Sequence, residues 1–230
     1  MQRNMKLLKK YSITFKLLTD NLIHLGYPER ERHYTNTLNV IPTRNQIDLV
    51  NTTKTLASMR KVLPIITTIV AKKGKILVYL QNTYLQNHKR KKELKLKQTF
   101  IHEKWPHGVI SNFKRLGKQS KKLKMKRLPN FVLYTLDDPT LYGPINTELK
   151  KTKIPSAIIA NTHIPADQNM YVVPGNTASD NSLILYKNLI LKAIIAGYQK
   201  EVFFFVNKKK RKKYIRRYNQ IKRKKKIRTS

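Results

Sequence analysis

Residues 53–80, TKTLASMRKVLPIITTIVAKKGKILVYL, hold the pattern that decides the fold. Over roughly 53–72 the apolar residues recur at helical spacing, and Asn51, Thr52 and Thr53 offer side-chain oxygens that can cap the start of that helix. The next stretch, 76–80, is apolar at every position, which is typical of a strand buried on both faces of a parallel sheet. A helix that leads directly into such a strand indicates an α/β fold.

The same alternation of helical and apolar segments extends in both directions from this stretch. Gly26 and Gly74 are expected to end the first two helices, and residues 27–46 are expected to be irregular. Helices are predicted at 6–25, 53–72, 84–97, 139–151 and 179–199, and strands at 47–50, 76–80, 99–102, 131–136, 157–160 and 170–173. This order predicts a three-layer, doubly wound, mainly parallel sheet of flavodoxin-like or Rossmann-like type.

The chain is strongly basic, with 49 Lys or Arg, 12 Asp or Glu and a formal net charge of +37 over 230 residues. Hydrophobic residues make up 40%, so we expect one α/β domain over 1–206 and a separate tail over 207–230. The charge favours a polyanionic partner, with nucleic acid first and an anionic membrane surface second. No apolar run approaches the roughly 20 residues of a membrane span. The absence of cysteine excludes disulfide bonds and cysteine-bound zinc.

Two segments concentrate the positive charge. Residues 114–127 hold eight Lys or Arg and no acid, and they connect two predicted strands. Residues 207–230 hold fourteen Lys or Arg and no acid. We expect this tail to be disordered alone and to follow RNA phosphates when bound, with Tyr214 and Tyr218 stacking on bases.

Motifs for enzyme chemistry are missing or have the wrong spacing. The sequence contains no GxGxxG and no GxxxxGK[ST], and residues 81–83 after the strand at 76–80 include no glycine. A zinc-protease pair requires two histidines four positions apart, whereas His102 and His107 are five apart and Pro106 interrupts a helix. We therefore predict no cofactor, no metal and no enzymatic activity.

Two polar segments at predicted strand ends have a structural and a functional reading. Asp137 and Asp138 can do acid–base work, but carboxylates before Pro139 are more typical of helix capping. Residues 174–176, PGN, can shape a ligand loop, and a turn into the last helix is the favoured interpretation. The two readings of this turn are compatible if it also lies against RNA or a neighbouring protein.

Several short motifs follow one another in a fixed order over roughly residues 15–200. They are His24-Leu25-Gly26, Arg44-Asn45 with Ile47-Asp48-Leu49, Lys73-Gly74-Lys75-Ile76-Leu77, Trp105-Pro106-His107-Gly108-Val109-Ile110-Ser111-Asn112-Phe113, Ile154-Pro155, Asn161-Thr162 and Val173-Pro174-Gly175-Asn176. In this order they resemble the motifs of the S-two family of small-subunit ribosomal proteins, in the form used by mitochondrial ribosomes. The ordered co-occurrence carries the resemblance, because each motif alone is short.

The chain departs from that family at several points. Bacterial members carry a long helical hairpin after the tryptophan motif, whereas here only seventeen residues separate Phe113 from Phe131. Thr177 and Ala178 stand where the family has two aspartates, and residues 32–34 replace an aromatic and Asn-Pro. The basic tail is not a general family feature. Contacts that the family makes through the hairpin are therefore not expected here.

The resemblance implies a structural component of the small subunit that binds rRNA and neighbouring ribosomal proteins at the head–body junction. Phosphate contacts through Arg and Lys are expected to carry the binding. Trp105, His107 and Phe113 are candidates for base stacking, with core packing the favoured role of Trp105 and Phe113. The candidate RNA-binding residues are Arg30, Arg32, Arg44, Lys89, Arg90, Lys114, Arg115, Lys121, Lys122, Lys124, Arg127, Lys208, Lys209, Arg211, Arg216 and Arg217.

The amino-acid usage points to an organelle genome. The sequence has 36 Lys, 22 Ile and 18 Asn against 8 Ala and 7 Gly, a bias expected from AT-rich coding DNA. Together with the resemblance to the mitochondrial form, this bias predicts a mitochondrial, organelle-encoded protein. Residues 1–18 can alternatively be read as a mitochondrial presequence, although Arg is sparse there.

Two other functions remain as alternatives. The first is an RNA-modifying enzyme on the same fold, which a nucleotide or methyl donor bound in a pocket would indicate. The second is a free, charge-driven protein that coats nucleic acid or a membrane surface. Co-sedimentation with small subunits through a salt wash separates this second alternative from a ribosomal component.

Overall fold

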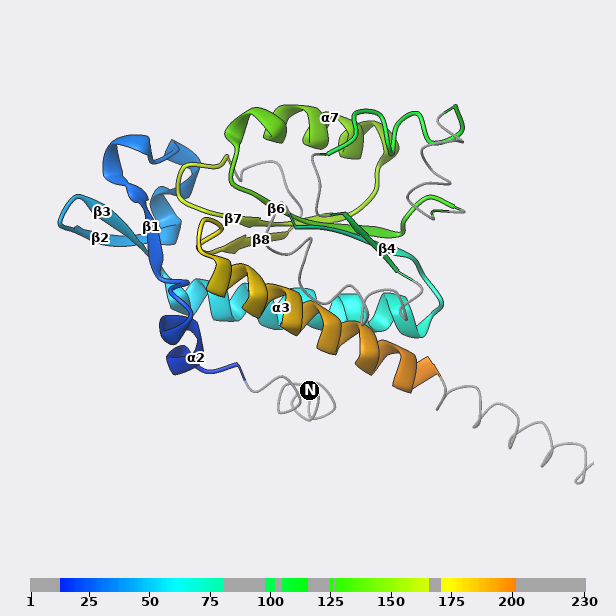
Figure 1. The fold of residues 1–230 in the computed structure, drawn as a ribbon, viewed down its shortest axis with the longest axis horizontal. Helices are drawn as coiled ribbons and strands as arrows, with labels where there is room; N and C mark the ends of the chain where they lie inside the picture. Colours follow the sequence, from blue (N-terminus) through cyan, green and yellow to red (C-terminus); the bar gives the residue numbers. More distant parts are fainter. Residues whose placement is uncertain are drawn as a thin grey trace, which may run out of the picture.

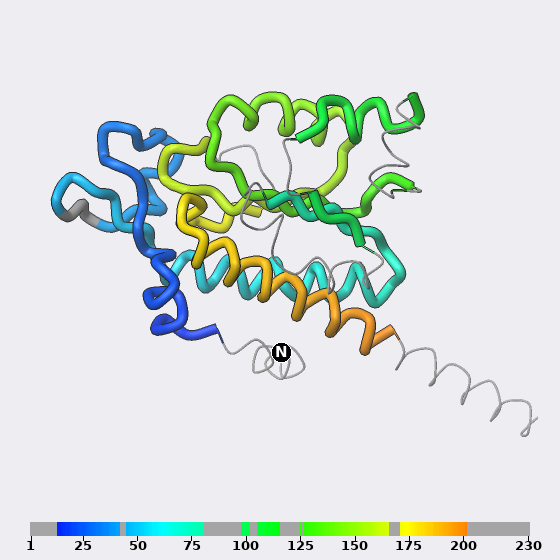
Figure 2. Tube along the Cα trace, viewed as in Figure 1, coloured from blue at the N-terminus to red at the C-terminus, as the bar shows by residue number. Residues whose placement is uncertain are grey.

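A computed structural model describes residues 13–80, 98–101, 105–115, 125, 127–165 and 171–201 (Figures 1 and 2). The elements in chain order are α2 (Phe15–Asp20), β1 (Leu25–Pro28), η1 (Glu29–Glu31), η2 (Tyr34–Asn39), β2 (Val40–Arg44), β3 (Ile47–Val50), α3 (Thr52–Ala71), β4 (Ile76–Leu80), β5 (Thr99–Ile101), β6 (Phe131–Leu136), η3 (Pro139–Leu141), α7 (Tyr142–Thr152), β7 (Ser156–Ala160) and β8 (Tyr171–Pro174). A last helix over 180–201, called here the C-terminal helix, follows β8.

The centre of the fold is a five-stranded parallel sheet in the order β5-β4-β6-β7-β8. Its register aligns Ile76 of β4 with Phe131 of β6, and Val132 of β6 with Ser156 of β7. Every residue of β4, β6 and β7 is buried, as expected for strands that are covered on both faces. The doubly wound α/β prediction is confirmed, and the strand order is that of the flavodoxin-like arrangement.

Helices cover both faces of this sheet and create two cores (Figure 1). Alternate side chains of β4 divide between them: Val78 packs into the core under α3 and the C-terminal helix. Tyr79 packs on the other side, into the core under α7 and the 105–113 loop. This alternation follows from the two-residue period of a strand and produces the three layers.

Helix α3 is capped at its start by Asn51, one of the three residues that the sequence offered, and it has an unexpected residue at its end. The side-chain oxygen of Asn51 accepts hydrogen bonds from the backbone N–H groups of Thr53 and Lys54, at 3.1 and 3.3 Å. At the other end Lys73, not Gly74, has the left-handed backbone, with φ 62°. Gly74 is required for space, because a Cβ there would lie 2.8 Å from the carbonyl oxygen of Ile69.

The first predicted helix is wrong beyond Asp20. Helix α2 ends there, Leu22 has φ 57°, and Leu25 begins a strand whose partner is Leu49. Gly26 is therefore a strand residue and not a helix cap. Its missing side chain lets β1 lie close to its neighbours, since a Cβ would come within 2.8 Å of Thr162 and 2.9 Å of the Asp48 carbonyl oxygen.

A second sheet forms where only irregular structure and one strand were expected. Strands β1, β3 and β2 make a three-stranded antiparallel sheet, called here the small sheet. The strand predicted at 47–50 is confirmed as β3. Residues 45 and 46 turn the chain between β2 and β3, both with positive φ. The predicted helix at 84–97 lies outside the described residues, as do His102, Met170 and the tail.

Candidate nucleic-acid interface

The small sheet closes the carboxyl edge of the parallel sheet over β6, β7 and β8. The backbone N–H of Tyr27 donates to Thr162 Oγ1 at 3.0 Å, and the N–H of His33 donates to the carbonyl oxygen of Thr162 at 3.0 Å. From the turn after β8, the side-chain amide of Asn176 donates to the Leu22 carbonyl oxygen at 2.9 Å. Enzymes of this fold bind ligands at this edge. Here the chain fills that part of it with its own backbone.

The two aspartates after β6 have different structural roles. Asp138 Oδ1 accepts from the Thr140 N–H at 2.9 Å and caps η3, which confirms the capping prediction for this residue. Asp137 does not cap a helix. Its Oδ1 accepts from the Tyr27 hydroxyl at 3.0 Å and from the Thr177 hydroxyl at 3.2 Å, so it joins the small sheet to the turn after β8. Burial, then the charge and hydrogen bond of Asp137, raises the pKa of Tyr27 to about 12.

Motifs that are far apart in the sequence meet at this closed edge. Asn161, at the end of β7, donates to Asn176 Oδ1 at 3.3 Å. The same oxygen accepts from the backbone N–H of Ala178 at 2.9 Å, which orients the start of the C-terminal helix. Asn36 of η2 donates to the Ile164 carbonyl oxygen at 2.6 Å. The 174–176 segment is thus a turn into the last helix, and these motifs hold the two sheets together.

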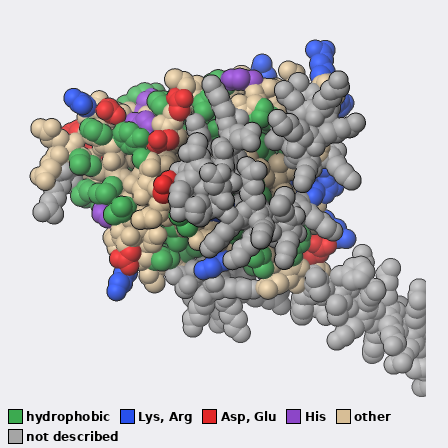
Figure 3. Space-filling model, viewed as in Figure 1, with side chains coloured by type: hydrophobic (Ala, Val, Ile, Leu, Met, Phe, Trp, Pro, Cys, Tyr) green, Lys and Arg blue, Asp and Glu red, His purple; other side chains and the backbone are tan. Residues whose placement is uncertain are grey.

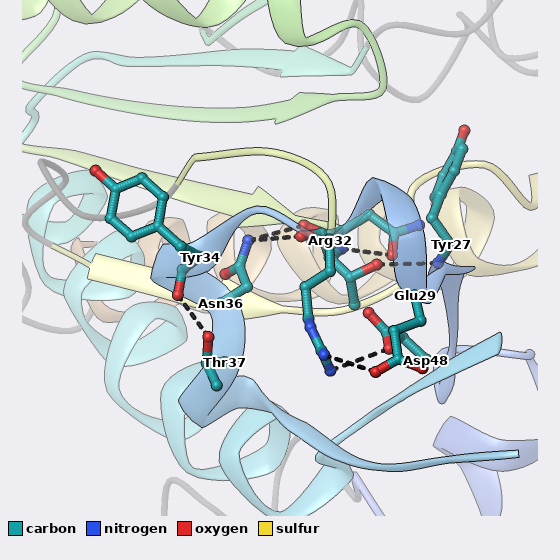
Figure 4. A network of polar contacts seen from close by, with 9 residues as sticks. Tyr27, Glu29, Arg32, Tyr34, Asn36, Thr37 and Asp48 are labelled. Carbon is teal, nitrogen blue, oxygen red and sulfur yellow. Dashed lines mark hydrogen bonds and ion pairs between the residues drawn. The ribbon is translucent and has the colours of Figure 1, made fainter. Parts of the chain in front are cut away.

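Arg32 lies in an ion-pair network within the small-sheet end of the molecule (Figure 4). Its guanidinium contacts Asp48 Oδ1 at 3.3 Å and Glu29 Oε1 at 3.0 Å. The Asp48 side chain is fully buried, and burial raises its pKa while the charge of Arg32 opposes the shift and Glu29 adds to it. The three-quarters-buried guanidinium is therefore oriented by protein carboxylates.

The tryptophan motif is fastened to α7 by one buried carboxylate. Glu148 Oε1 accepts from the Gly108 N–H at 2.6 Å, and Oε2 accepts from the Ile110 N–H at 3.1 Å. Trp105 is 1% exposed and packs edge-on against Tyr79, with ring centroids 5.2 Å apart. Core packing of Trp105 is confirmed, and Phe113 packs half-buried against the same core. His107 is the exposed ring of the motif.

The structure separates the predicted RNA-binding residues that it describes. Arg30 and Arg32 lie at the small-sheet end, whereas Arg127 precedes β6 at the opposite, amino edge of the parallel sheet. Lys114 and Arg115 are exposed at the end of the described segment 105–115. The side chain of Arg44 lies outside the described residues, as do Lys89, Arg90, Lys121, Lys122, Lys124, Lys208, Lys209, Arg211, Arg216 and Arg217.

Sequence reasoning missed a group of cations at the amino edge. Residues 72–75, 127–130 and 150–155, which come just before β4, β6 and β7, contain seven Lys or Arg and no acid: Lys72, Lys73, Lys75, Arg127, Lys150, Lys151 and Lys153. Figure 3 shows Lys and Arg side chains on this side of the molecule, whereas the small-sheet side shows mainly apolar and acidic side chains with some Lys and Arg among them. The available signal was the recurrence of lysine clusters immediately before buried strands.

Within the described residues, no three His, Asp or Glu side chains lie together as a metal site. None of the described helices is both long and apolar enough to cross a bilayer. These residues form a doubly wound α/β protein whose carboxyl edge is closed by its own small sheet and whose amino edge is cationic.

Comparison with known proteins shows a likeness to one family of ribosomal proteins. The family model for ribosomal protein S2 matches residues 18–128. The small ribosomal subunit protein uS2 of Pseudoalteromonas atlantica is 23% identical over 217 residues, which cover 78% of this chain and 89% of the relative. The uS2 protein of Bradyrhizobium diazoefficiens is 24% identical over 220 residues, 80% of this chain and 66% of that protein. The chain is thus similar to ribosomal protein S2 over residues 18–128, and to uS2 proteins of the small ribosomal subunit over about four fifths of its length.

Proposed function

We propose that this protein is a structural component of the mitochondrial small ribosomal subunit, where it binds rRNA and neighbouring proteins at the head–body junction. The family supports the subunit, and the excess of Lys, Ile and Asn over Ala and Gly supports an AT-rich organelle genome. The sequence resemblance to the mitochondrial form supports the placement.

The observation that carries the RNA-binding part is the charge. With 49 Lys or Arg against 12 acids, intramolecular pairing can neutralise only a small fraction of the cations. Ion pairs among the described residues include those of Arg32 with Glu29 and Asp48, and that of Lys73 with Glu201. An RNA backbone supplies the missing counter-charge, and release of its condensed counterions favours binding.

A protein neighbour is supported by apolar side chains at the small-sheet end. Tyr34 and Leu38 of η2 are 77% and 80% exposed, and Ile41 and Ile47 of the small sheet are 43% and 41% exposed. Residues 13–51 contain four acids and four Lys or Arg, so this end carries no net charge in a chain of +37. Phosphates gain nothing by covering apolar side chains. We propose that a basic ribosomal protein with an apolar segment docks here, with exposed Glu29 and Glu31 as its counter-charges.

The decisive experiment is expression of the tagged full chain in mitochondria, followed by sedimentation of lysate through a high-salt sucrose gradient. We expect the protein to remain with the small subunit, and density for it at the head–body junction of the intact ribosome. Recovery in free fractions at high salt would contradict the proposal and favour a charge-driven coating protein. Co-sedimentation with cytosolic but not mitochondrial subunits would overturn the location alone.

A further inference from the structure

One five-residue pattern occurs twice at equivalent positions of the fold. Residues 72–76 are KKGKI and residues 150–154 are KKTKI. The first connects the end of α3 to β4, and the second connects the end of α7 to β7. Helices α3 and α7 lie on opposite faces of the sheet. Because the strands that follow them are parallel, both lysine segments nevertheless lie at the same amino edge.

The two lysine turns are close enough to act together. Strand β6 lies between β4 and β7, so the two turns are separated by two strand spacings, about 10 Å. The connection into the intervening strand carries Arg127, whose guanidinium donates to the Lys73 carbonyl oxygen at 2.6 Å. Cations therefore follow one another along three neighbouring strands.

The backbone at both turns favours glycine, but the sequence has lysine. Lys73 has φ 62° and Lys153 has φ 53°, in the left-handed region. At the end of α3 the N–H of Gly74 donates to the Ile69 carbonyl oxygen, and the N–H of Lys73 donates to the Val70 carbonyl oxygen. In helix ends with this pair of hydrogen bonds, the position of Lys73 is usually glycine. Glycine would relieve the strain at Lys73 and Lys153, so the presence of lysine at both positions indicates a use for its side chain.

Stabilisation of the helices explains only part of this cluster. Cations near a helix C-terminus interact favourably with the helix dipole, and that effect acts within the last turn. It does not explain Arg127, which follows no helix in the described chain. Lys73, whose side chain is 71% exposed, pairs with Glu201, with 3.7 Å between its Nζ atom and a carboxylate oxygen. Such an exposed pair contributes little.

We propose that the amino edge of the parallel sheet, built from the 72–75 and 150–153 turns with Arg127 between them, binds backbone phosphates of RNA. This assignment rests on the proposed rRNA-binding function and gives it a location. Two basic segments meet the described fold at this edge. Arg127 is the last residue of the basic segment 114–127, and Glu201, the last described residue before the segment 207–230, contacts Lys73. Lysine ammonium groups on short turns meet phosphate oxygens without regard to base sequence.

The test compares two pairs of glycine substitutions in the full chain. The variant Lys73→Gly/Lys153→Gly removes both side chains and relieves both left-handed lysines. The control Asn45→Gly/Gln46→Gly relieves two left-handed residues, with φ 51° and 62°, in the β2–β3 turn without changing charge. Binding to a small-subunit rRNA transcript is measured across a salt series, together with thermal unfolding.

We expect the lysine variant to be at least as stable as the wild type and to bind RNA more weakly. The slope of log K against log salt is negative, and its magnitude should decrease by about 1.5, since each phosphate contact contributes roughly 0.7–0.9 to that magnitude. A second pair, Lys72→Gln/Lys151→Gln against Arg60→Gln/Lys61→Gln on the exposed middle of α3, repeats the comparison without changing the left-handed residues Lys73 and Lys153.

The outcomes separate this inference from the function on which it rests. An unchanged slope for both amino-edge variants, in a chain that still binds rRNA, overturns the edge assignment and leaves the proposed function standing. Equal losses in the Arg60/Lys61 control would show diffuse charge attraction and also overturn it. A wild-type chain without salt-dependent affinity for rRNA would instead remove the proposed function.

Discussion

Glu148 Oε1 of α7 lies 2.6 Å from the backbone nitrogen of Gly108, and the other carboxylate oxygen lies 3.1 Å from that of Ile110. One carboxylate, 7% exposed, thus fixes the loop that carries Trp105, His107 and Phe113. A carboxylate that satisfies otherwise orphaned N–H groups is expensive to remove, because the donors stay buried when it is gone.

Replacement of Glu148 by Ala should lower the free energy of unfolding by about 2–4 kcal/mol, since hydrogen bonds to a charged group are worth roughly 1.5–3 kcal/mol each and are not additive. Urea denaturation measures the change. Thr147→Ala on the exposed side of the same helix is the matched control and should change stability by less than about 0.5 kcal/mol. Equal effects of the two substitutions would contradict a special role for the carboxylate.

The link between Tyr27 and Asp137 should appear as a coupling energy. Tyr27→Phe and Asp137→Ala each remove the same hydrogen bond, so the double mutant should be less destabilised than the sum of the singles, by about 1 kcal/mol. Tyr34→Phe, on a ring that is 77% exposed, serves as a control without such coupling. Strict additivity of Tyr27→Phe and Asp137→Ala would mean that the contact does not stabilise the closed edge.

Asp48 should give the stability a recognisable pH dependence. Burial raises its pKa in the folded protein, so the ionised form is disfavoured there relative to the unfolded chain. As the pH falls through the raised pKa of the folded state, the free energy of unfolding of the wild type should therefore rise relative to that of Asp48→Asn. The rise should end once the pH is below the pKa of the unfolded chain, about 3.9. Thermal unfolding of both proteins between pH 7 and pH 3.5 measures this. A constant difference across that range would be the opposing result.

The exposed apolar side chains at the small-sheet end should matter for assembly more than for folding. Tyr34→Ser/Leu38→Ser changes residues that are 77% and 80% exposed, so the free energy of unfolding should change by less than about 1 kcal/mol. Incorporation into small subunits, measured by quantitative sedimentation, should fall. Leu128→Ser, 42% exposed near the amino edge, is the control and should incorporate normally. Normal incorporation of the double variant would argue against a protein partner at this end.

Deletion of residues 208–230 tests the basic tail separately from the folded domain. The deletion removes fourteen Lys or Arg and should flatten the salt dependence of rRNA binding. If about six phosphates are involved, a fourfold rise in salt weakens the full chain by roughly a hundred- to a thousandfold, and the truncated chain by much less. An unchanged slope after deletion would assign all phosphate contacts to residues 1–207.

The sequence predicts some parts of the candidate site and leaves others hidden. The lysines before β4 and β7 are visible in the sequence as KKGKI and KKTKI, but only the strand order β4-β6-β7 places Arg127 between them. The roles of Asp137 and Glu148 were hidden, because their partners lie 110 and 40 residues away, at Tyr27 and Gly108. Whether the tail and the other predicted cations contact RNA stays a prediction.

The sequence by itself determined the strands at 76–80, 131–136 and 157–160, since continuous apolar runs cannot remain exposed and parallel strands are buried on both faces. It also determined α3, through its apolar spacing and the Asn51 cap. Only the tertiary structure ended the first helix at Asp20 and made Leu25–Pro28 a strand, because pairing with β3 outweighs local helix propensity. The fold likewise decided the left-handed backbone at Lys73. A Cβ at position 74 would come too close to Ile69, so glycine occupies that position, and the preceding residue, Lys73, adopts the left-handed conformation.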